Sequence, residues 1–198
     1  MKAISFATCA VMLFLSTIAW SQAGMLKANG QKFAVTQAAA QQSSAELAFA
    51  RLKTLAGNWK GQAAMGPQPG MGAPVRVSLR VTSGGDALLH EMVPEGRADD
   101  PSNGADDPVT MFYIDGDRLL LTHYCDSGKN RPRMAGKLSP DGKTVEFDFV
   151  DVSGGTKYGH MHQAVFTIID ADHHTEDWTY MLPGDKPVRA HMDLQRAK

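Results

Sequence analysis

Gly57-Asn58-Trp59-Lys60-Gly61 marks the point where the hydrophobic period of this chain changes from helical to alternating. Residues 46–56, just before it, carry apolar side chains at helical spacing and end at Gly57, which predicts a short amphipathic helix. About ten short alternating segments follow, separated by turns rich in Gly, Pro and Asp. A Gly-x-Trp that opens the first strand, between a helix and a series of hairpins, predicts a closed antiparallel β-barrel.

The strand pattern supports closure of the sheet. Residues 75–82 alternate strictly between apolar and polar side chains, and Asp115-Gly116 between two apolar runs is a strong hairpin signal. No helix-length segment separates any two strands, so neighbours in sequence should pair antiparallel. We therefore expect an all-β, about ten-stranded up-and-down closed barrel, with the short helix closing one end. An open two-sheet jelly roll, which would leave strand edges, is the alternative.

The N-terminus has the features of a secretory signal peptide over residues 1–23. Lys2 supplies a positive charge, residues 4–20 are almost wholly apolar, and Ser21-Gln22-Ala23 fits a small-x-small cleavage site before Gly24. A membrane anchor is the alternative, but the apolar run is rather short for one and ends in small polar residues. We expect export, to the periplasm or the medium.

Residues 24–45 are rich in Ala, Gln and Ser and lack periodicity, which predicts a disordered leader before a single barrel domain over 46–198. The whole chain has a formal charge of −1, and loss of Lys2 makes it −2. There is no basic stripe, so nucleic acid is not an expected partner. No second long apolar segment follows, so no membrane span is expected after cleavage. Removal of Cys9 leaves Cys125 without an intrachain disulfide partner.

The helix, the segment 57–61 and a last strand that ends in Arg196 resemble the calycin group of barrels: lipocalins, fatty-acid-binding proteins and nitrobindin-like proteins. The resemblance is architectural and spans roughly residues 46–196. It implies that Trp59 packs under Arg196, or less well under Arg189, and so closes the barrel base, because a guanidinium plane stacks on an indole face. It does not extend to haem: His191 lies on the polar side of its strand, and its spacing differs from the nitrobindin pattern.

Alternation also assigns the side chains that should face the barrel interior. The predicted ligand-binding residues are His123, Cys125, His160, His162, Glu176, Trp178 and Tyr180. Imidazoles among aromatic side chains would give an apolar cavity a few polar anchor points. The simpler alternative is that His160 and His162, which follow a Gly-rich turn, are solvated.

The same histidines raise the question of a metal. His160-x-His162 is similar to the metal motif of cupins, but no carboxylate follows at the cupin offset. His160, His162, His123 and Glu176 could still supply donors for zinc, copper or iron. His173-His174 beside Asp172 is interpreted as a turn feature. We assign no metal and no cofactor.

The preferred function is a non-enzymatic carrier or sensor that is exported and binds a small apolar molecule. The first alternative is a metal- or haem-dependent enzyme that uses the barrel histidines, and the second is a secreted structural or interaction domain with a packed interior. The chain has no Gly-x-Ser-x-Gly and no serine beside an evident base, so no catalytic residue is assigned.

Overall fold

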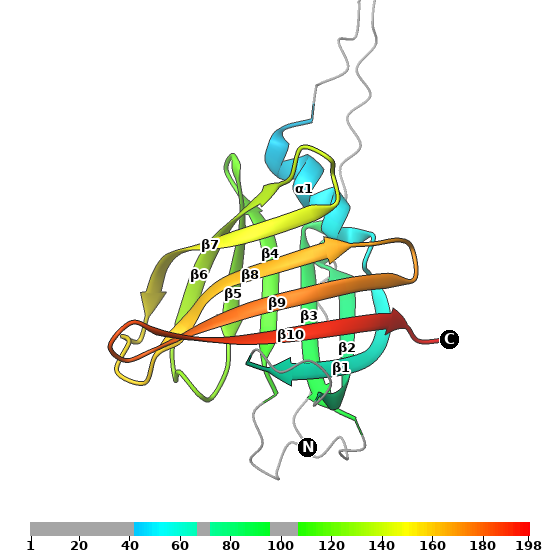
Figure 1. Cartoon of the computed structure of the whole chain (residues 1–198). Coiled ribbons are helices and arrows are strands. Elements are labelled where there is room, and N and C mark those ends of the chain that lie inside the picture. Colours follow the sequence, from blue (N-terminus) through cyan, green and yellow to red (C-terminus); the bar gives the residue numbers. More distant parts are fainter. Residues whose placement is uncertain (1–41, 67–71, 96–106) are drawn as a thin grey trace, which may run out of the picture. The chain divides into compact units, whose positions relative to one another are not determined.

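The computed structural model describes residues 42–66, 72–95 and 107–198. The predicted signal peptide and nearly all of the predicted leader lie outside these residues. Within them, one helix precedes ten antiparallel strands that close into a barrel (Figure 1). The prediction of a closed all-β barrel with one short helix is therefore confirmed, and the open jelly roll is excluded.

The strands follow one another around the barrel in chain order. Helix α1 spans Ser44–Lys53, and the ten strands are β1 (Gly57–Met65), β2 (Ala73–Thr82), β3 (Ala87–Pro94), β4 (Val109–Asp115), β5 (Arg118–Tyr124), β6 (Arg131–Leu138), β7 (Thr144–Ser153), β8 (His160–Ile168), β9 (His173–Leu182) and β10 (Lys186–Arg196). A single 3-10 turn, η1 (Ser83–Gly85), joins β2 to β3. The last strand pairs with the first, with Trp59 opposite Arg196, and this pairing closes the sheet.

Helix α1 begins two residues before the predicted start because Ser43 and Glu46 form a capping box. The Glu46 amide donates to Ser43 Oγ (3.2 Å), and the Ser43 amide donates to Glu46 Oε2 (2.7 Å). The buried face carries Ala45, Ala48, Phe49 and Leu52, whereas Leu47 is half exposed. Phe49 lies about one turn before Leu52, so the two side chains share one face of the helix. The helix packs against β4, β5, β6 and β7. No helix in the described residues is long and apolar enough to cross a membrane.

The end of the barrel next to α1 is filled by a packed core. Its largest fully buried side chains are Trp59, Phe112, Phe147, Phe166, Leu52, Leu55, Leu88, Leu119, Leu121, Met134 and Leu194. Phe112 lies 5.4 Å from Phe147 and 5.4 Å from Phe166, measured between ring centroids, in tilted and edge-to-face arrangements. Such aromatic packing leaves this half of the interior without room for a ligand.

Trp59 and Arg196 hold the helix to the two strands that close the barrel. Trp59 is fully buried, and its Nε1–H donates to the Leu55 carbonyl at 2.8 Å. Arg196 Cζ lies 4.1 Å from the centroid of the Trp59 ring. The same guanidinium donates to the carbonyls of Ala56 (2.9 Å, from Nη1) and Ala171 (2.9 Å, from Nε). One side chain therefore ties the end of the helix, the base of β1 and the β8–β9 turn together.

The two glycines of the segment 57–61 make this closure possible. Gly57 has a φ of 140°, and a Cβ built there would lie 2.5 Å from Arg196 Nη1. A Cβ on Gly61 would overlap the backbone carbonyl of Asp193 in β10. Both positions lack room for a side chain because β10 and its terminal arginine approach β1 closely.

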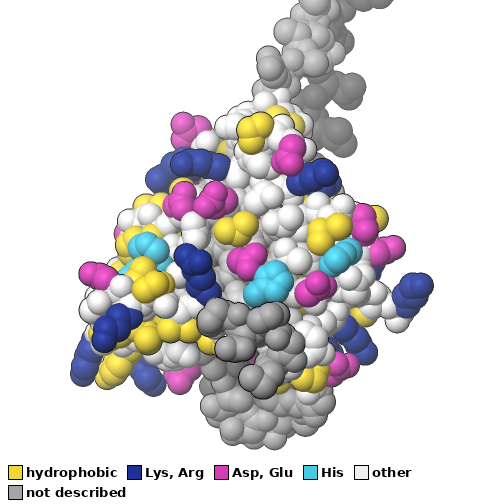
Figure 2. Space-filling model, viewed as in Figure 1, with side chains coloured by type: hydrophobic (Ala, Val, Ile, Leu, Met, Phe, Trp, Pro, Cys, Tyr) yellow, Lys and Arg dark blue, Asp and Glu magenta, His cyan; other side chains and the backbone are white. Residues whose placement is uncertain are grey.

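The outer face of β9 and β10 carries imidazoles next to carboxylates, and Figure 2 shows His and Asp or Glu side chains side by side there. His173 Nε2 lies 3.0 Å from Asp193 Oδ1, and His191 Nδ1 lies 2.7 Å from Asp177 Oδ1. His191 thus faces outward, on the polar side of its strand. These pairs are exposed or half exposed, so each contributes at most about 1 kcal/mol to stability.

We predict that Arg196→Lys lowers the free energy of unfolding by about 1–3 kcal/mol, because lysine loses the planar stack on Trp59 and most of the hydrogen bonds to helix and turn carbonyls. Urea unfolding followed by tryptophan fluorescence measures this loss. Arg189→Lys is the matched control, since Arg189 is exposed on the same strand. Equal effects of the two substitutions would show that Arg196 has no special role in closure.

Candidate functional site

A cavity of about 520 Å³ occupies the end of the barrel away from α1. The helix is joined by residues 54–56 to the first residue of β1, whereas the cavity residues Ala63 and Met65 lie at the other end of that strand. The volume falls in the range of roughly 300–1,000 Å³ that is typical of small-molecule sites. The barrel interior is therefore packed near the helix and hollow at the opposite end.

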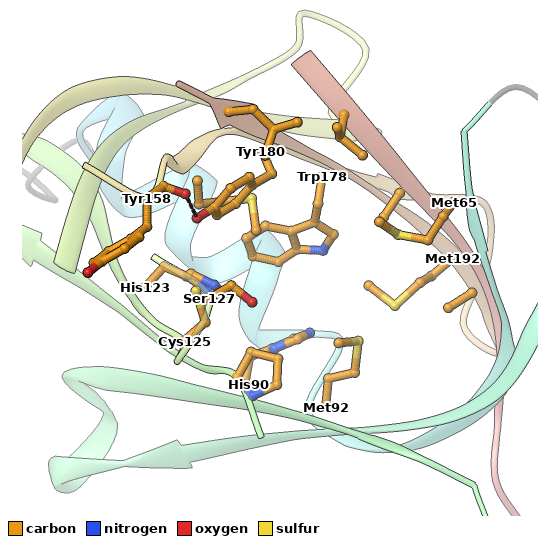
Figure 3. Close-up of a pocket in the computed structure, with 16 residues that line it drawn as sticks. Met65, His90, Met92, His123, Cys125, Ser127, Tyr158, Trp178, Tyr180 and Met192 are labelled. Carbon is orange, nitrogen blue, oxygen red and sulfur yellow. Dashed lines mark hydrogen bonds between the residues drawn. The ribbon is translucent and has the colours of Figure 1, made fainter. Parts of the chain in front are cut away.

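Most of the cavity wall is apolar, and four methionines contribute to it. The lining residues are Ala63, Met65, His90, Met92, Pro108, His123, Cys125, Ser127, Tyr158, Met161, Trp178, Tyr180, Leu182, Val188, Ala190 and Met192. Figure 3 shows Met65, Met92 and Met192 with Trp178 around one space. Thioether side chains are polarisable and adapt their shape, so this wall suits an apolar guest of variable outline.

Behind one wall of the cavity lies a buried carboxylate, Glu176, which receives three N–H donors. His90 Nε2 lies 3.0 Å from its Oε2, His174 Nε2 lies 3.1 Å from its Oε1, and Trp178 Nε1 donates to Oε2 at 3.0 Å. An ionised carboxylate only accepts hydrogen bonds, so both imidazoles present their Nε2–H to it. Glu176, His90 and His174 come from inward positions of β9 and β3, whose backbones lie on different sides of the barrel.

The environment of Glu176 keeps it ionised. Burial by itself raises the pKa of a carboxyl group, but in acid the charge on His90 and the hydrogen bonds from His174 and His90 act in the opposite direction. The latter effects prevail, so the pKa of Glu176 lies well below its usual range. The carboxylate thus remains a fixed acceptor at neutral pH.

His90 and Trp178 line the cavity and also contact Glu176, and His123 lies beside them in the cavity wall. His90, Thr110 and His123 lie side by side on β3, β4 and β5, and Thr110 Oγ1 is 2.8 Å from His123 Nδ1. The Trp178 ring centroid is 5.8 Å from that of His90 and 5.4 Å from that of His123, with the planes tilted. These contacts hold both imidazoles at the cavity wall, where each is almost fully buried.

Four of the predicted site residues come together at this cavity: His123, Cys125, Trp178 and Tyr180. Glu176 also points inward but lies behind the wall, where it contacts His90 and Trp178. Tyr180 Oη donates to the Tyr158 carbonyl at 2.9 Å, as the dashed line in Figure 3 shows. The alternation along β5 and β9 therefore assigned the inward face of these two strands correctly.

His160 and His162 do not line this cavity, and the expectation that both point into it is wrong. The register of β8 against β9 shifts between Met161 and Gln163, so His162 is the extra residue of a bulge. Met161 pairs with Tyr180 and lines the cavity, whereas His160 pairs with Met181. The rule that every second residue before Ala164 faces inward therefore does not hold beyond the bulge.

The two displaced histidines form a small cluster with Phe149. His162 stacks on the Phe149 ring at 5.2 Å between centroids, and His160 Nε2 lies 3.2 Å from His162 Nδ1. Burial, and next the proximity of His162, lower the pKa of His160. Across residues 42–66, 72–95 and 107–198, no three His, Cys, Asp or Glu side chains gather as a group that could hold a metal ion.

Two histidines that complete the Glu176 cluster were not predicted there: His90 was missed, and the interpretation of His174 as a turn feature is wrong, because His174 is fully buried in β9. His90 lies on the inward parity of β3 between Leu88 and Met92, and His174 shares the parity of Glu176 in β9. A histidine at an alternate position of a strand that is otherwise apolar indicates a buried imidazole, which needs a hydrogen-bond partner. The identity of the partner could not be read from sequence, since Glu176 lies 86 residues after His90.

Comparison with known proteins supports the fold only. No family model matches this chain, and no curated protein matches it. The crystal structure of Rv2717c from M. tuberculosis is similar, with a TM-score of 0.55 and 14% identity over 76% of this chain and 98% of that one. A protein of unknown function from the DUF3598 family of Nostoc punctiforme has a TM-score of 0.49 and 12% identity over 74% of this chain and 49% of its own. Membership of a calycin family stays a prediction.

We predict that Glu176→Gln lowers the free energy of unfolding at pH 7 by about 1–3 kcal/mol, because the amide cannot accept from all three N–H donors. The pKa of Glu176 is lower in the folded chain than in the unfolded chain, so its stabilising effect is present above about pH 4.5 and declines as the pH falls further. The difference between wild type and variant should therefore shrink in acid.

Urea unfolding at several pH values between 3 and 7 measures this difference. Glu91→Gln serves as the control, since Glu91 is exposed on the strand that carries His90. A wild-type–variant difference that is constant over this pH range would contradict the assignment of Glu176 as a buried anion.

Proposed function

We propose that this chain is an exported binding protein that holds a small, largely apolar molecule in the barrel cavity. The observation that carries the proposal is a cavity of about 520 Å³ whose wall is mainly apolar, with its imidazoles gathered beside Trp178. Pockets of this kind combine a large apolar contact area with a few polar groups that orient the guest.

The same cavity argues against an interior that serves packing alone. In the half of the barrel next to α1 the side chains pack closely. Phe112, Phe147 and Phe166 are fully buried there, and their rings contact one another. The other half has the same kinds of residue but leaves a space between them. Empty space in a core costs stability, so a hollow of this size favours a binding role.

An enzyme that uses all the barrel histidines together is less well supported. His123 lies at the cavity, whereas His160 and His162 lie beside Phe149 at the bulge of β8. The histidines predicted to act together are thus divided between two places. The binding role needs only the residues that the cavity brings together.

We predict that Ala63→Phe weakens binding of an apolar guest at least roughly ten-fold, a loss of about 1.4 kcal/mol, because the new ring occupies the cavity. Displacement or direct titration of Nile red, a neutral apolar dye, measures the affinity. Ala64→Phe is a matched control: it adds the same ring to the next residue of β1, which pairs with the outward-facing His191.

The fold of both variants is compared by circular dichroism and thermal unfolding. If Ala63→Phe does not fold, Ala190→Leu tests the same wall from β10, opposite Met65. Nile red that binds wild type and the cavity-filling variants equally well would show that the cavity is not the binding site. Native mass spectrometry of protein isolated from its own cells then tests whether a guest purifies with it.

Export is the second part of the proposal, and it rests on residues 1–23. Lys2, the apolar run 4–20 and the small residues at 21–23 are the three parts of a cleavable signal. We predict that the exported chain begins near Gly24, as N-terminal sequencing of the periplasmic or secreted fraction would show. An intact Met1 in that fraction would contradict cleavage.

A further inference from the structure

The charges around the cavity indicate that its guest is neutral. None of the described residues that line it is Asp, Glu, Lys or Arg. The carboxylate behind the wall, Glu176, is fully buried and already receives three N–H donors. A charged guest would lose its hydration without gaining an opposite charge at the wall, and that loss is costly.

The second observation is the state of the His90 ring. Its Nε2–H is held by Glu176, so in the neutral ring the proton sits on Nε2 and Nδ1 carries a lone pair. Three N–H groups thus point at the carboxylate. Nδ1 of His90 has no hydrogen-bond partner among the described residues. His90 as a whole is only 3% exposed.

A buried acceptor without a partner is unfavourable, and a ligand can supply the missing donor. His90 is a wall residue of the cavity, next to Met92 on β3 and close to Trp178 (Figure 3). His174 also has a buried Nδ1 without a described partner, but its ring packs against Trp59 at 4.2 Å and does not line the cavity. Of these two rings, only His90 is therefore in a position to meet a guest.

We propose that the cavity selects neutral, mainly apolar molecules that carry a hydroxyl or N–H group, and that His90 Nδ1 accepts the hydrogen bond from that group. Glu176 is a positioning residue in this site: it does not touch the guest but holds the proton of His90 on Nε2. The proposal rests on the proposed binding function and specifies the chemical class of its ligand.

The test compares two probes of nearly equal shape, 2-naphthol and 2-methylnaphthalene, by displacement of Nile red from the full chain. The first carries the hydroxyl donor and the second a methyl group in its place. The ratio of their affinities should move about five- to ten-fold toward 2-methylnaphthalene in His90→Phe, which keeps a ring and removes both nitrogens. Met92→Leu is the control: it alters the neighbouring wall, and both affinities should shift together.

Two further measurements keep the test decisive if His90→Phe does not fold. In Glu176→Gln the ring is retained but its tautomer is released, so the affinity ratio should again move toward 2-methylnaphthalene. In the wild type, ¹⁵N chemical shifts of the histidine rings report which nitrogen of His90 carries the proton. A proton on Nε2 with Nδ1 bare supports the proposal, and a proton on Nδ1 overturns it.

The outcomes separate this inference from the proposed function. Nile red that does not bind at all would overturn the binding function, and this inference with it. Probes that bind with the same affinity ratio in wild type and His90→Phe would overturn the inference alone. Tighter binding of 2-naphthoate than of 2-naphthol would also overturn it, because the site would then prefer an anion.

Discussion

The stack of Arg196 on Trp59 is the contact on which the closed barrel depends. It joins the first and last strands, which are the two that must meet for the sheet to have no edge. The same guanidinium also donates to the carbonyl of Ala56, in the short link between the helix and β1. The helix, the closing strand pair and the base of the barrel are thus held by one planar cation, with Gly57 leaving the room that it needs.

Closure at one end explains why the interior is divided into a packed half and a hollow half. Near the helix, Trp59 and the phenylalanines fill the space between the strands. Away from it, none of the described residues forms a second helix over the strands, and the wall there is built from smaller and more flexible side chains such as Ala63, Met92 and Met192. The stability of the fold is concentrated at one end, so the other end can keep a cavity.

The Glu176 cluster lies at the boundary between these two halves. Its donors come from opposite sides of the barrel, so it acts as a polar cross-link through an apolar interior. A buried network of this kind is favourable only when its members are satisfied. Within it, Nδ1 of His90 and Nδ1 of His174 lack a described partner, and of the two residues only His90 lines the cavity.

Alternation and turn residues were enough to predict the barrel, because the inward face of a strand repeats every second residue and a hairpin needs particular turn residues. They also placed His123, Cys125, Trp178 and Tyr180 at the interior. They failed in β8, since one bulged residue reverses the parity beyond it and leaves no clear mark in the sequence. They could not pair His90 with Glu176 either, because that contact crosses the barrel and depends on its curvature.

The bulge at His162 has a consequence for how such a barrel can change over generations. Met161 already lies opposite Tyr180 and Gln163 opposite Thr179, so loss of His162 alone would remove the bulge and leave both pairs as they are. The methionine would stay at the cavity wall, and only the imidazole that stacks on Phe149 would disappear. A one-codon deletion at this point would thus leave the cavity wall and the strand pairing as they are.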